Sequence, residues 1–333
     1  MTLSRTAAIH VVAPQTSSKP VGIAHGDAAT IAEISAGLLA QQASTSPKYF
    51  YDSLGSHLFE AICELPEYYP TRTEAAIFAR HGADMAARIG PGAILLDLGA
   101  GNCAKAASLF PLLQPRQYVP IDIASDFLQE AAAQLRQRFP AIDMTPLVMD
   151  LSQPLALPAT VPVQGRQFFY PGSSIGNFTP RDAVAFLRQV RENVGKDGGL
   201  LIGVDLVKDS AVLDAAYDDA IGVTAAFNLN MLRHLNHLAG ANFDPAQWRH
   251  VAFFNEAESR IEMHLEALCA LTVHWSGGER RFAQGERIHT ENSYKYTLEG
   301  FGKLLSEAGF RVDGTWTDDA HWFAVLHAAA DYA

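Results

Sequence analysis

The stretch AILLDLGAGNCAK, residues 93–105, joins a short apolar run to a glycine turn and then to a helical pattern. Glycines in such a turn allow a sharp bend and a close approach of the backbone to a ligand. The N-terminus of the helix behind the turn favours anionic groups. Gly99, Gly101 and Ala104 also fit the loose dinucleotide pattern G-x-G-x-x-[G/A]. The stretch therefore predicts a nucleotide-like cofactor, and both NAD and S-adenosylmethionine (SAM) fit it.

Apolar runs and helical patterns alternate on the C-terminal side of this turn. Helical patterns lie between the runs, and a last helix over 297–310 precedes two final strands over 311–319 and 322–329. Strands separated by helices of this length predict a parallel sheet covered on both faces. The further strands are expected, turns included, at 117–124, 144–151, 166–178 and 196–206.

The alternation stops after residue 210, where a helical pattern containing residues 215–238 is followed by antiparallel-looking strands such as 259–275. We interpret this segment as an insertion that joins the N-terminal helices in a second domain. The predicted fold is an α/β doubly wound sheet with an antiparallel last strand, plus a second α+β domain.

Composition limits the possible partners. The net charge is −11 and basic residues form no run, so the sequence predicts no nucleic-acid partner. No apolar run is long enough to cross a bilayer, and no membrane partner is expected. Cys63, Cys103 and Cys269 lie far apart, which suits a reducing cytoplasm. Nothing indicates a coiled coil or a sticky face, so a monomer is the default expectation.

Residues beyond the turn distinguish the two cofactors. Asp122 ends the second strand, where an acidic residue binds a ribose diol in either case. Asp150 ends the third strand, where SAM-dependent methyltransferases often contact the adenine. The glycine turn before the fifth strand and the C-terminal hairpin also resemble those enzymes. A dinucleotide fingerprint would more often lie near the start of the chain, whereas Gly99 lies well inside it. These features favour SAM over NAD.

With SAM as the cofactor, the predicted fold is an α/β, class I methyltransferase-like doubly wound sheet with an antiparallel last strand, plus an α+β substrate-binding domain. The expected parts are a flexible tail (1–24), a substrate-binding domain (25–72 and 211–297) and a SAM-binding Rossmann-like domain (73–210 and 298–333).

Several long and irregular motifs run through the chain. They are YFYDSLGSHLFEAICELPEYYPTRTE (49–74), GSSIGNFTP (172–180), LLIGVDLVKDSAVLDAAYDDAIGVTAAFN (200–228), IEMHL (261–265) and HTENSYKY (289–296). Together they resemble one family, the histidine-specific N-alpha-methyltransferases of ergothioneine biosynthesis. The resemblance covers the chain from about residue 25 to its C-terminus and implies that SAM trimethylates L-histidine to hercynine. Around the glycine turn the family usually carries Glu and Ser or Thr, where this chain has DLGAGNCAK, and FYPGSSIGNF also differs slightly from the usual form.

The resemblance also implies a set of site residues. Asn177 and Tyr217 match a pair that holds the substrate carboxylate, and Tyr51 and Tyr68 match tyrosines near the amino group. Glu291 and Ser293 match the pair that binds the imidazole ring. Further pocket walls and the cofactor site complete the set. The walls are Phe59, Gly172, Ser174 and Met263; the cofactor residues are Gly99, Gly101, Lys105, Asp122 and Asp150.

Methyl transfer to an amine is an in-line displacement that needs an aligned and neutral amine. Tyr51 is the first candidate to accept or relay the proton, and the reaction calls for no metal. A buried carboxylate and hydroxyl at Glu291 and Ser293 would select imidazole over phenyl, because an unpaired buried polar group is costly.

Residue patterns alone leave other interpretations open. The tyrosines and Met263 also fit a core, Asn177 fits a turn, and Glu291 and Ser293 fit a solvated strand face. His234 and His237 have helical spacing but no further metal ligand beside them in sequence. The rival functions are an N-methyltransferase for another amino acid such as a tryptophan derivative, an NAD-dependent oxidoreductase, and a non-catalytic binding module.

Overall fold

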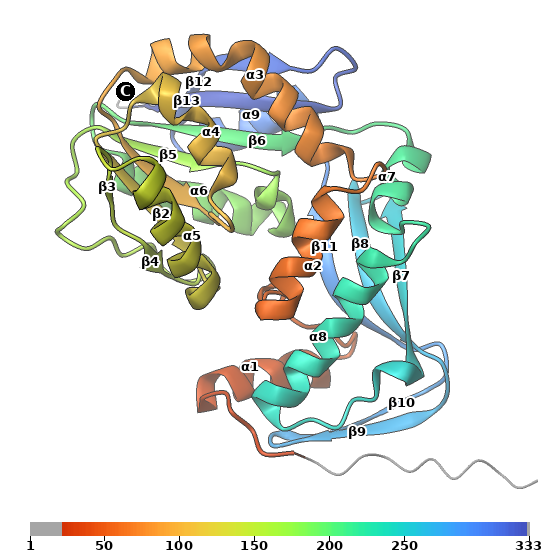
Figure 1. Ribbon diagram of the computed structural model, residues 1–333. Coiled ribbons are helices and arrows are strands. Elements are labelled where there is room, and N and C mark those ends of the chain that lie inside the picture. The colour runs from red at the N-terminus through yellow and green to blue at the C-terminus, as the bar shows by residue number, and fades with distance from the viewer. Residues whose placement is uncertain (1–21, 332–333) are drawn as a thin grey trace, which may run out of the picture.

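The computed structural model describes residues 22–331, and its largest element is an eight-stranded mixed sheet (Figure 1). The inner strands are parallel, β13 runs antiparallel to β6, and β12 runs antiparallel to β13. This confirms the predicted doubly wound sheet with antiparallel end strands. The order is β12 (Phe310–Thr317), β13 (Phe323–Ala330), β6 (Gly199–Asp205), β5 (Arg166–Tyr170), β1 (Ile94–Leu98), β2 (Gln117–Asp122) and β3 (Asp143–Met144), with β4 (Leu147–Val148) also paired to β2.

One predicted strand, 144–151, is not continuous. It is split into β3 and β4, which pair with different parts of β2. Pro146 lies between the two pieces and has no backbone N–H to give to a ladder. The prediction of a single third strand was therefore wrong in its continuity, although both pieces lie at the expected edge of the sheet.

Helices cover both faces of this sheet. Alternate side chains of β1 enter different cores: Leu95 packs in one with α3 and α4, and Leu96 packs in the other with α6 and α9. This alternation follows from the two-residue period of a strand and buries both faces. The covering helices are α3 (Tyr69–Ile89), α4 (Ala104–Leu113), α5 (Ser125–Arg138), α6 (Pro180–Val194) and α9 (Leu298–Glu307).

A separate hydrophobic core gathers the N-terminal helices and the segment after β6. Figure 1 shows these elements below and to the right of the large sheet. We keep the two-domain division as a proposal, in which this core belongs to the substrate-binding part. The elements are α1 (Ala28–Leu39), η1 (Pro47–Phe50), α2 (Ser53–Cys63), α7 (Ser210–Tyr217), α8 (Val223–Ala239), η3 (Pro245–Gln247), the sheet β11 (Arg287–Tyr294), β8 (Arg260–Ala267) and β7 (Trp248–Asn255), and the hairpin β9 (Leu271–Trp275) and β10 (Gly278–Phe282).

The helix predicted over 215–238 is interrupted. α7 ends at Tyr217 and α8 begins at Val223, after Gly222 in the left-handed conformation (φ 79°). The Asp219 carboxylate accepts hydrogen bonds from the backbone N–H groups of Val223 and Thr224, and so caps the new helix. The break places Tyr217 at a helix end, where its ring can reach β11.

Two predictions concern the chain ends and membranes. The tail expected over 1–24 lies, up to residue 21, outside the described residues. Within residues 22–331 no helix combines the length and the apolar character needed to cross a bilayer.

Candidate functional site

A pocket lies where the carboxyl end of the large sheet meets the second core. It brings together Tyr51 and every residue that the resemblance placed around the substrate. These residues come from segments far apart in sequence: α2, η2 (Ser174–Asn177), α7, β8 and β11. The pocket also contains residues that the sequence analysis did not name. The predicted residues are Tyr51, Phe59, Tyr68, Gly172, Ser174, Asn177, Tyr217, Met263, Glu291 and Ser293; the additional ones are Ile62, Ser173, Ala216, Thr224 and Phe227.

Aromatic rings form one wall of the pocket. Tyr51 meets Phe59 edge to face at 5.9 Å between ring centroids, and Phe59 meets Tyr68 in the same way at 6.2 Å. Phe227 of α8 lies 5.9 Å from Tyr51 and 6.0 Å from Phe59. Phe227 falls within the motif 200–228, but no residue next to it in sequence marked its role.

Burial controls the ionisation of the wall tyrosines. It raises the pKa of Tyr51 and Tyr68 well above the ordinary value, and the nearby Glu291 charge adds to the effect. Both hydroxyls are therefore protonated at neutral pH. Such a hydroxyl passes a proton on only if it gives up its own, so Tyr51 suits a relay better than a standing base.

Glu291 provides the acidic group of the pocket. It lies on β11, and its Oε1 accepts a hydrogen bond of 3.2 Å from the Asn177 amide. Burial raises the pKa of Glu291 to about 7, while the positive charge of Lys295 opposes the rise. The carboxyl group is therefore poised to gain or lose a proton near neutral pH.

Tyr217 and Ser293 are joined to a buried lysine that the sequence analysis missed. The Lys295 ammonium donates to the Tyr217 hydroxyl (3.0 Å) and to Ser293 Oγ (2.8 Å), and it pairs with Asp205 Oδ2 at 2.9 Å. Burial alone would lower the pKa of Lys295, but the Asp205 carboxylate outweighs it and the pKa lies above the ordinary value. Glu291 and Ser293 alternate on β11, and Lys295 continues the two-residue spacing directly after the last residue of that strand, so the spacing could have identified this lysine.

The hydroxyl protons of this network can be counted. Lys295 has three N–H donors, and its three partners use all of them. Tyr217 and Ser293 lie 2.8 Å apart, so one of their two hydroxyl protons fills the bond between them. The other proton remains for a ligand. Lys295 therefore fixes both hydroxyl oxygens as acceptors and leaves one donor directed at the pocket.

The predicted cofactor turn connects β1 to α4. Gly99 and Gly101 have positive φ (69° and 52°), and no described atom lies within 4 Å of where a Cβ would stand on either. Asp122 Oδ2 accepts from the Gly101 N–H at 2.9 Å, which fixes the turn beside the end of β2. The buried Asp97 Oδ1 has no partner among the described residues, and burial raises the pKa of this carboxyl to about 7. The open turn and the unpartnered oxygen fit a polar cofactor such as SAM.

The other two cofactor candidates are engaged in ion pairs. Lys105 pairs at 2.7 Å with Glu74, a fully buried residue of α3 whose other oxygen accepts from the Gly172 N–H. Asp150 pairs at 3.0 Å with Lys48 of the N-terminal segment. The Lys105–Glu74 pair lies within the cofactor half and reaches the substrate pocket through Gly172, whereas the Lys48–Asp150 pair joins η1 to the cofactor half. The sequence pattern did not reveal either connection.

His234 and His237 do not come together as metal ligands. His234 Nδ1 lies 2.8 Å from the carbonyl oxygen of Tyr49, and the His237 ring stacks on His25 at 4.4 Å.

Comparisons with known proteins agree with this geometry. The family of histidine-specific, SAM-dependent methyltransferases matches residues 30–330. The histidine N-alpha-methyltransferase of Mycolicibacterium smegmatis is 39% identical over 300 residues, covering 88% of this chain and 92% of the relative. That of Mycobacterium tuberculosis is 36% identical over 304 residues, covering 89% and 94%. Ergothioneine biosynthesis protein 1 of Neurospora crassa is 32% identical over 276 residues, covering 80% of this chain and 31% of the relative.

Proposed function

The chain belongs to the histidine-specific, SAM-dependent methyltransferases, and from this premise we propose that it trimethylates the α-amino group of L-histidine. The product is hercynine, formed through the mono- and dimethyl intermediates as the first step of ergothioneine biosynthesis. One observation carries the proposal: a single pocket combines Glu291 and Ser293 with a wall of aromatic rings. The names of the mycobacterial relatives support the same reaction.

In this proposal the polar end of the pocket recognises the imidazole ring. Glu291 and Ser293 receive the two ring nitrogens, and a phenyl ring would offer a hydrogen bond to neither group. Asn177 orients the Glu291 carboxyl group, to which it already donates a hydrogen bond. Asn177 and Tyr217 hold the substrate carboxylate, and the spare hydroxyl proton of the Tyr217–Ser293 pair is a donor available for it.

The aromatic end of the pocket receives the amino group. When bound, SAM supplies an electrophilic methyl group. The substrate nitrogen must be neutral to use its lone pair, so one proton leaves before each of the three N–C bonds forms. Tyr51 relays these protons towards solvent while Tyr68 orients the nitrogen. The product is a quaternary ammonium, which Phe59 and Phe227 stabilise through their ring faces.

The residues that would hold SAM lie around the glycine turn. Gly99 and Gly101 admit the ligand close to the backbone, and Asp122 accepts from the ribose hydroxyls. Lys105 and Asp150 complete the set, with Asp150 at the adenine end. We further propose that the protein acts as a monomer in the cytoplasm and that residues 25–72 and 211–297 form the substrate-binding domain.

Mass spectrometry of purified protein tests the reaction. Incubation with SAM and a panel of amino acids, including histidine, its mono- and dimethyl derivatives and tryptophan, is expected to yield hercynine from the histidine series alone. Turnover of tryptophan instead would transfer the proposal to the rival substrate. Binding of histidine and SAM without product would indicate a non-catalytic module. Calorimetry that detects NADH binding and none of SAM would favour the oxidoreductase.

A further inference from the structure

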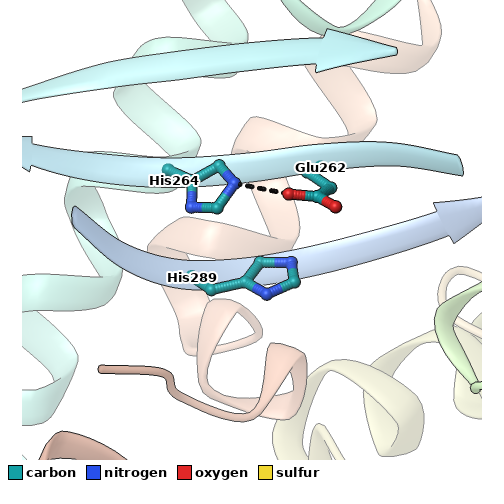
Figure 2. A group of neighbouring side chains, drawn as sticks. All are labelled: Glu262, His264 and His289. Atoms are coloured by element: carbon teal, nitrogen blue, oxygen red, sulfur yellow. Dashed lines mark hydrogen bonds and ion pairs between the residues drawn. The ribbon is translucent and has the colours of Figure 1, made fainter. Parts of the chain in front are cut away.

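Two histidines and a glutamate lie together on the outer face of the sheet that lines the pocket. Glu262 and His264 alternate on β8, and His289 pairs directly with His264 on β11 (Figure 2). Met263, between the first two, points to the opposite face and lines the substrate pocket. The cluster therefore shares its strands with the substrate site but not its space.

Short distances connect the three side chains. His264 Nε2 lies 3.0 Å from Glu262 Oε2, and the rings of His264 and His289 stack at 4.7 Å between centroids. One nitrogen or oxygen atom from each residue can be chosen so that all three lie within 4.8 Å of one another. His264 Nδ1 is buried and has no partner among the described residues. His264 is 6% exposed, so this nitrogen is a buried polar atom that a ligand could satisfy.

Neighbouring groups hold the cluster in position. Glu262 Oε1 accepts from the Asn255 amide (2.9 Å) and from Arg260 (2.7 Å), which leaves Oε2 facing His264. The Phe253 ring stacks on His264, nearly parallel and at 5.6 Å. Supporting contacts of this kind orient the ligands of metal sites. An open hollow of about 510 Å³ lies over the cluster and would admit a hydrated ion.

Arginines and glutamates form ion pairs around the cluster. Arg260 pairs with Glu262 at 2.7 Å, and Arg287 pairs with Glu266 at 2.8 Å. Glu286, which also lines the hollow, pairs with Arg280. Glu266 also pairs with Arg249 at 2.5 Å, so two arginines share this carboxylate and one positive charge is left in excess. A divalent cation would therefore depend on direct ligand bonds from the cluster and not on a surrounding negative field.

We propose that Glu262, His264 and His289 form a binding site for a divalent transition metal ion of the zinc class, with water in the remaining position. Two imidazoles and one carboxylate are a usual ligand set for zinc, whereas magnesium and calcium prefer oxygen ligands alone. Bonds of about 2.0–2.2 Å place tetrahedral ligand atoms roughly 3.4 Å apart, so the site closes around the ion by small side-chain rotations. The half-buried His289 has most freedom to make them.

Ion binding would act on the substrate pocket through β11. His289 Nε2 lies 2.9 Å from the backbone oxygen of Glu291, two residues along the strand. Rotation of His289 towards an ion changes this contact, and the ion also fastens β11 to β8. The site is distinct from the methyl-transfer chemistry and stands whether or not histidine is the substrate.

Metal titration of the tag-free, chelator-treated full chain tests the proposal. We expect one Zn²⁺ per chain by calorimetry, and a Co²⁺ absorption spectrum typical of a nitrogen- and oxygen-ligated ion. His264→Gln and His289→Gln should each weaken binding at least about tenfold. His274→Gln is the matched control, because His274 also pairs with a glutamate, Glu279 at 3.0 Å, on the neighbouring hairpin. The Zn²⁺ affinity of His274→Gln should equal that of the unaltered protein.

Two results would overturn the site. The first is absence of Zn²⁺ binding by the unaltered chain up to about 100 μM. The second is unchanged binding by both His264→Gln and His289→Gln, which would place the ion elsewhere. Circular dichroism checks the fold of each variant. Should His264→Gln fail to fold, the more exposed His289→Gln and the Co²⁺ spectrum of the unaltered protein still decide the question.

Discussion

The two sheets of this protein prepare their ligand sites in different ways. The inner strands of the large sheet are buried on both faces, as β1 shows from Ile94 to Leu98, and in the proposed site the turn that follows presents mainly backbone to the cofactor. β8 and β11 carry polar side chains on both faces, with Glu291 and Ser293 on one and His264 and His289 on the other. The proposed site at the large sheet therefore depends on the shape of the backbone, whereas the sites on β8 and β11 depend on side chains.

This difference predicts how the two sites fail. A backbone turn survives most side-chain changes around it, because its N–H groups and its shape remain. A buried side-chain network fails when one member is lost, since the partners remain buried and unpaired. Substitutions in the network of β11 should therefore have larger effects than substitutions beside the glycine turn.

The largest effect is expected from Lys295→Met. Lys295 is 3% exposed and its three donors serve Asp205, Tyr217 and Ser293. Breaking a buried ion pair costs about 3–5 kcal/mol, and Lys208, which also pairs with Asp205, should keep the loss near the lower value. Denaturant unfolding measures this loss. The KM for histidine should also rise at least about tenfold while SAM affinity changes little, because two pocket hydroxyls lose their orientation.

Lys303→Met provides the control for this substitution. Lys303 is exposed on α9 and pairs with Glu299 one helical turn away. Such surface pairs contribute about 0.3–0.5 kcal/mol. If the two variants were equally stable, the ammonium of Lys295 would add nothing to the network and the contrast between the sheets would lose its main support.

The sequence was informative where structure follows a local period. The runs at 93–98 and 117–124 became β1 and β2, and the end strands turned antiparallel as expected. Local patterns failed at Pro146, which divides the third strand, and between α7 and α8, where the chain leaves the helix after Tyr217 and re-enters it after Gly222. In both places a few residues interrupt an otherwise continuous pattern.

The pocket could not be assembled from local patterns. Its residues come from segments more than two hundred positions apart, and the family resemblance, not periodicity, indicated that Tyr51 and Glu291 belong together. The Glu262–His264–His289 cluster needed knowledge of strand pairing. His264 faces His289 only because β8 and β11 pair in one particular register.

The second-largest effect is a change of up to about 3 kcal/mol in the free energy of unfolding with pH. Burial raises the pKa of Glu291 from 4.5 to about 7, and each pKa unit corresponds to about 1.4 kcal/mol. The folded protein then binds more protons than the unfolded chain between these values, so its stability falls as pH rises from about 4.5 to 7. Glu291→Gln removes this titration but keeps an acceptor for Asn177. As pH rises from about 4.5 to 7, the free energy of unfolding of the variant, measured with denaturant, should therefore increase relative to that of the unaltered protein. A constant difference would show that Glu291 titrates normally and is not desolvated.

The smallest of these effects is expected beside the glycine turn, from Asp122→Ala. The Asp122 carboxylate accepts from the N–H groups of Gly101 and Ala124, and in the proposed site it also accepts from the ribose. The turn itself is retained through the backbone, since the Gly99 N–H still donates to the Ile121 carbonyl. SAM affinity should therefore fall about tenfold, or roughly 1.4 kcal/mol, without loss of the fold.

Calorimetry with SAM measures the change, and Asp126→Ala, in the first turn of α5, is the control. Histidine affinity should be preserved, because Asp122 is absent from the residues that line the pocket. Unchanged SAM affinity would mean that the turn binds the cofactor through backbone alone, which would sharpen the contrast with β11. Unfolding of the variant would show that the turn depends on this side chain, and the contrast between the two sheets would be lost.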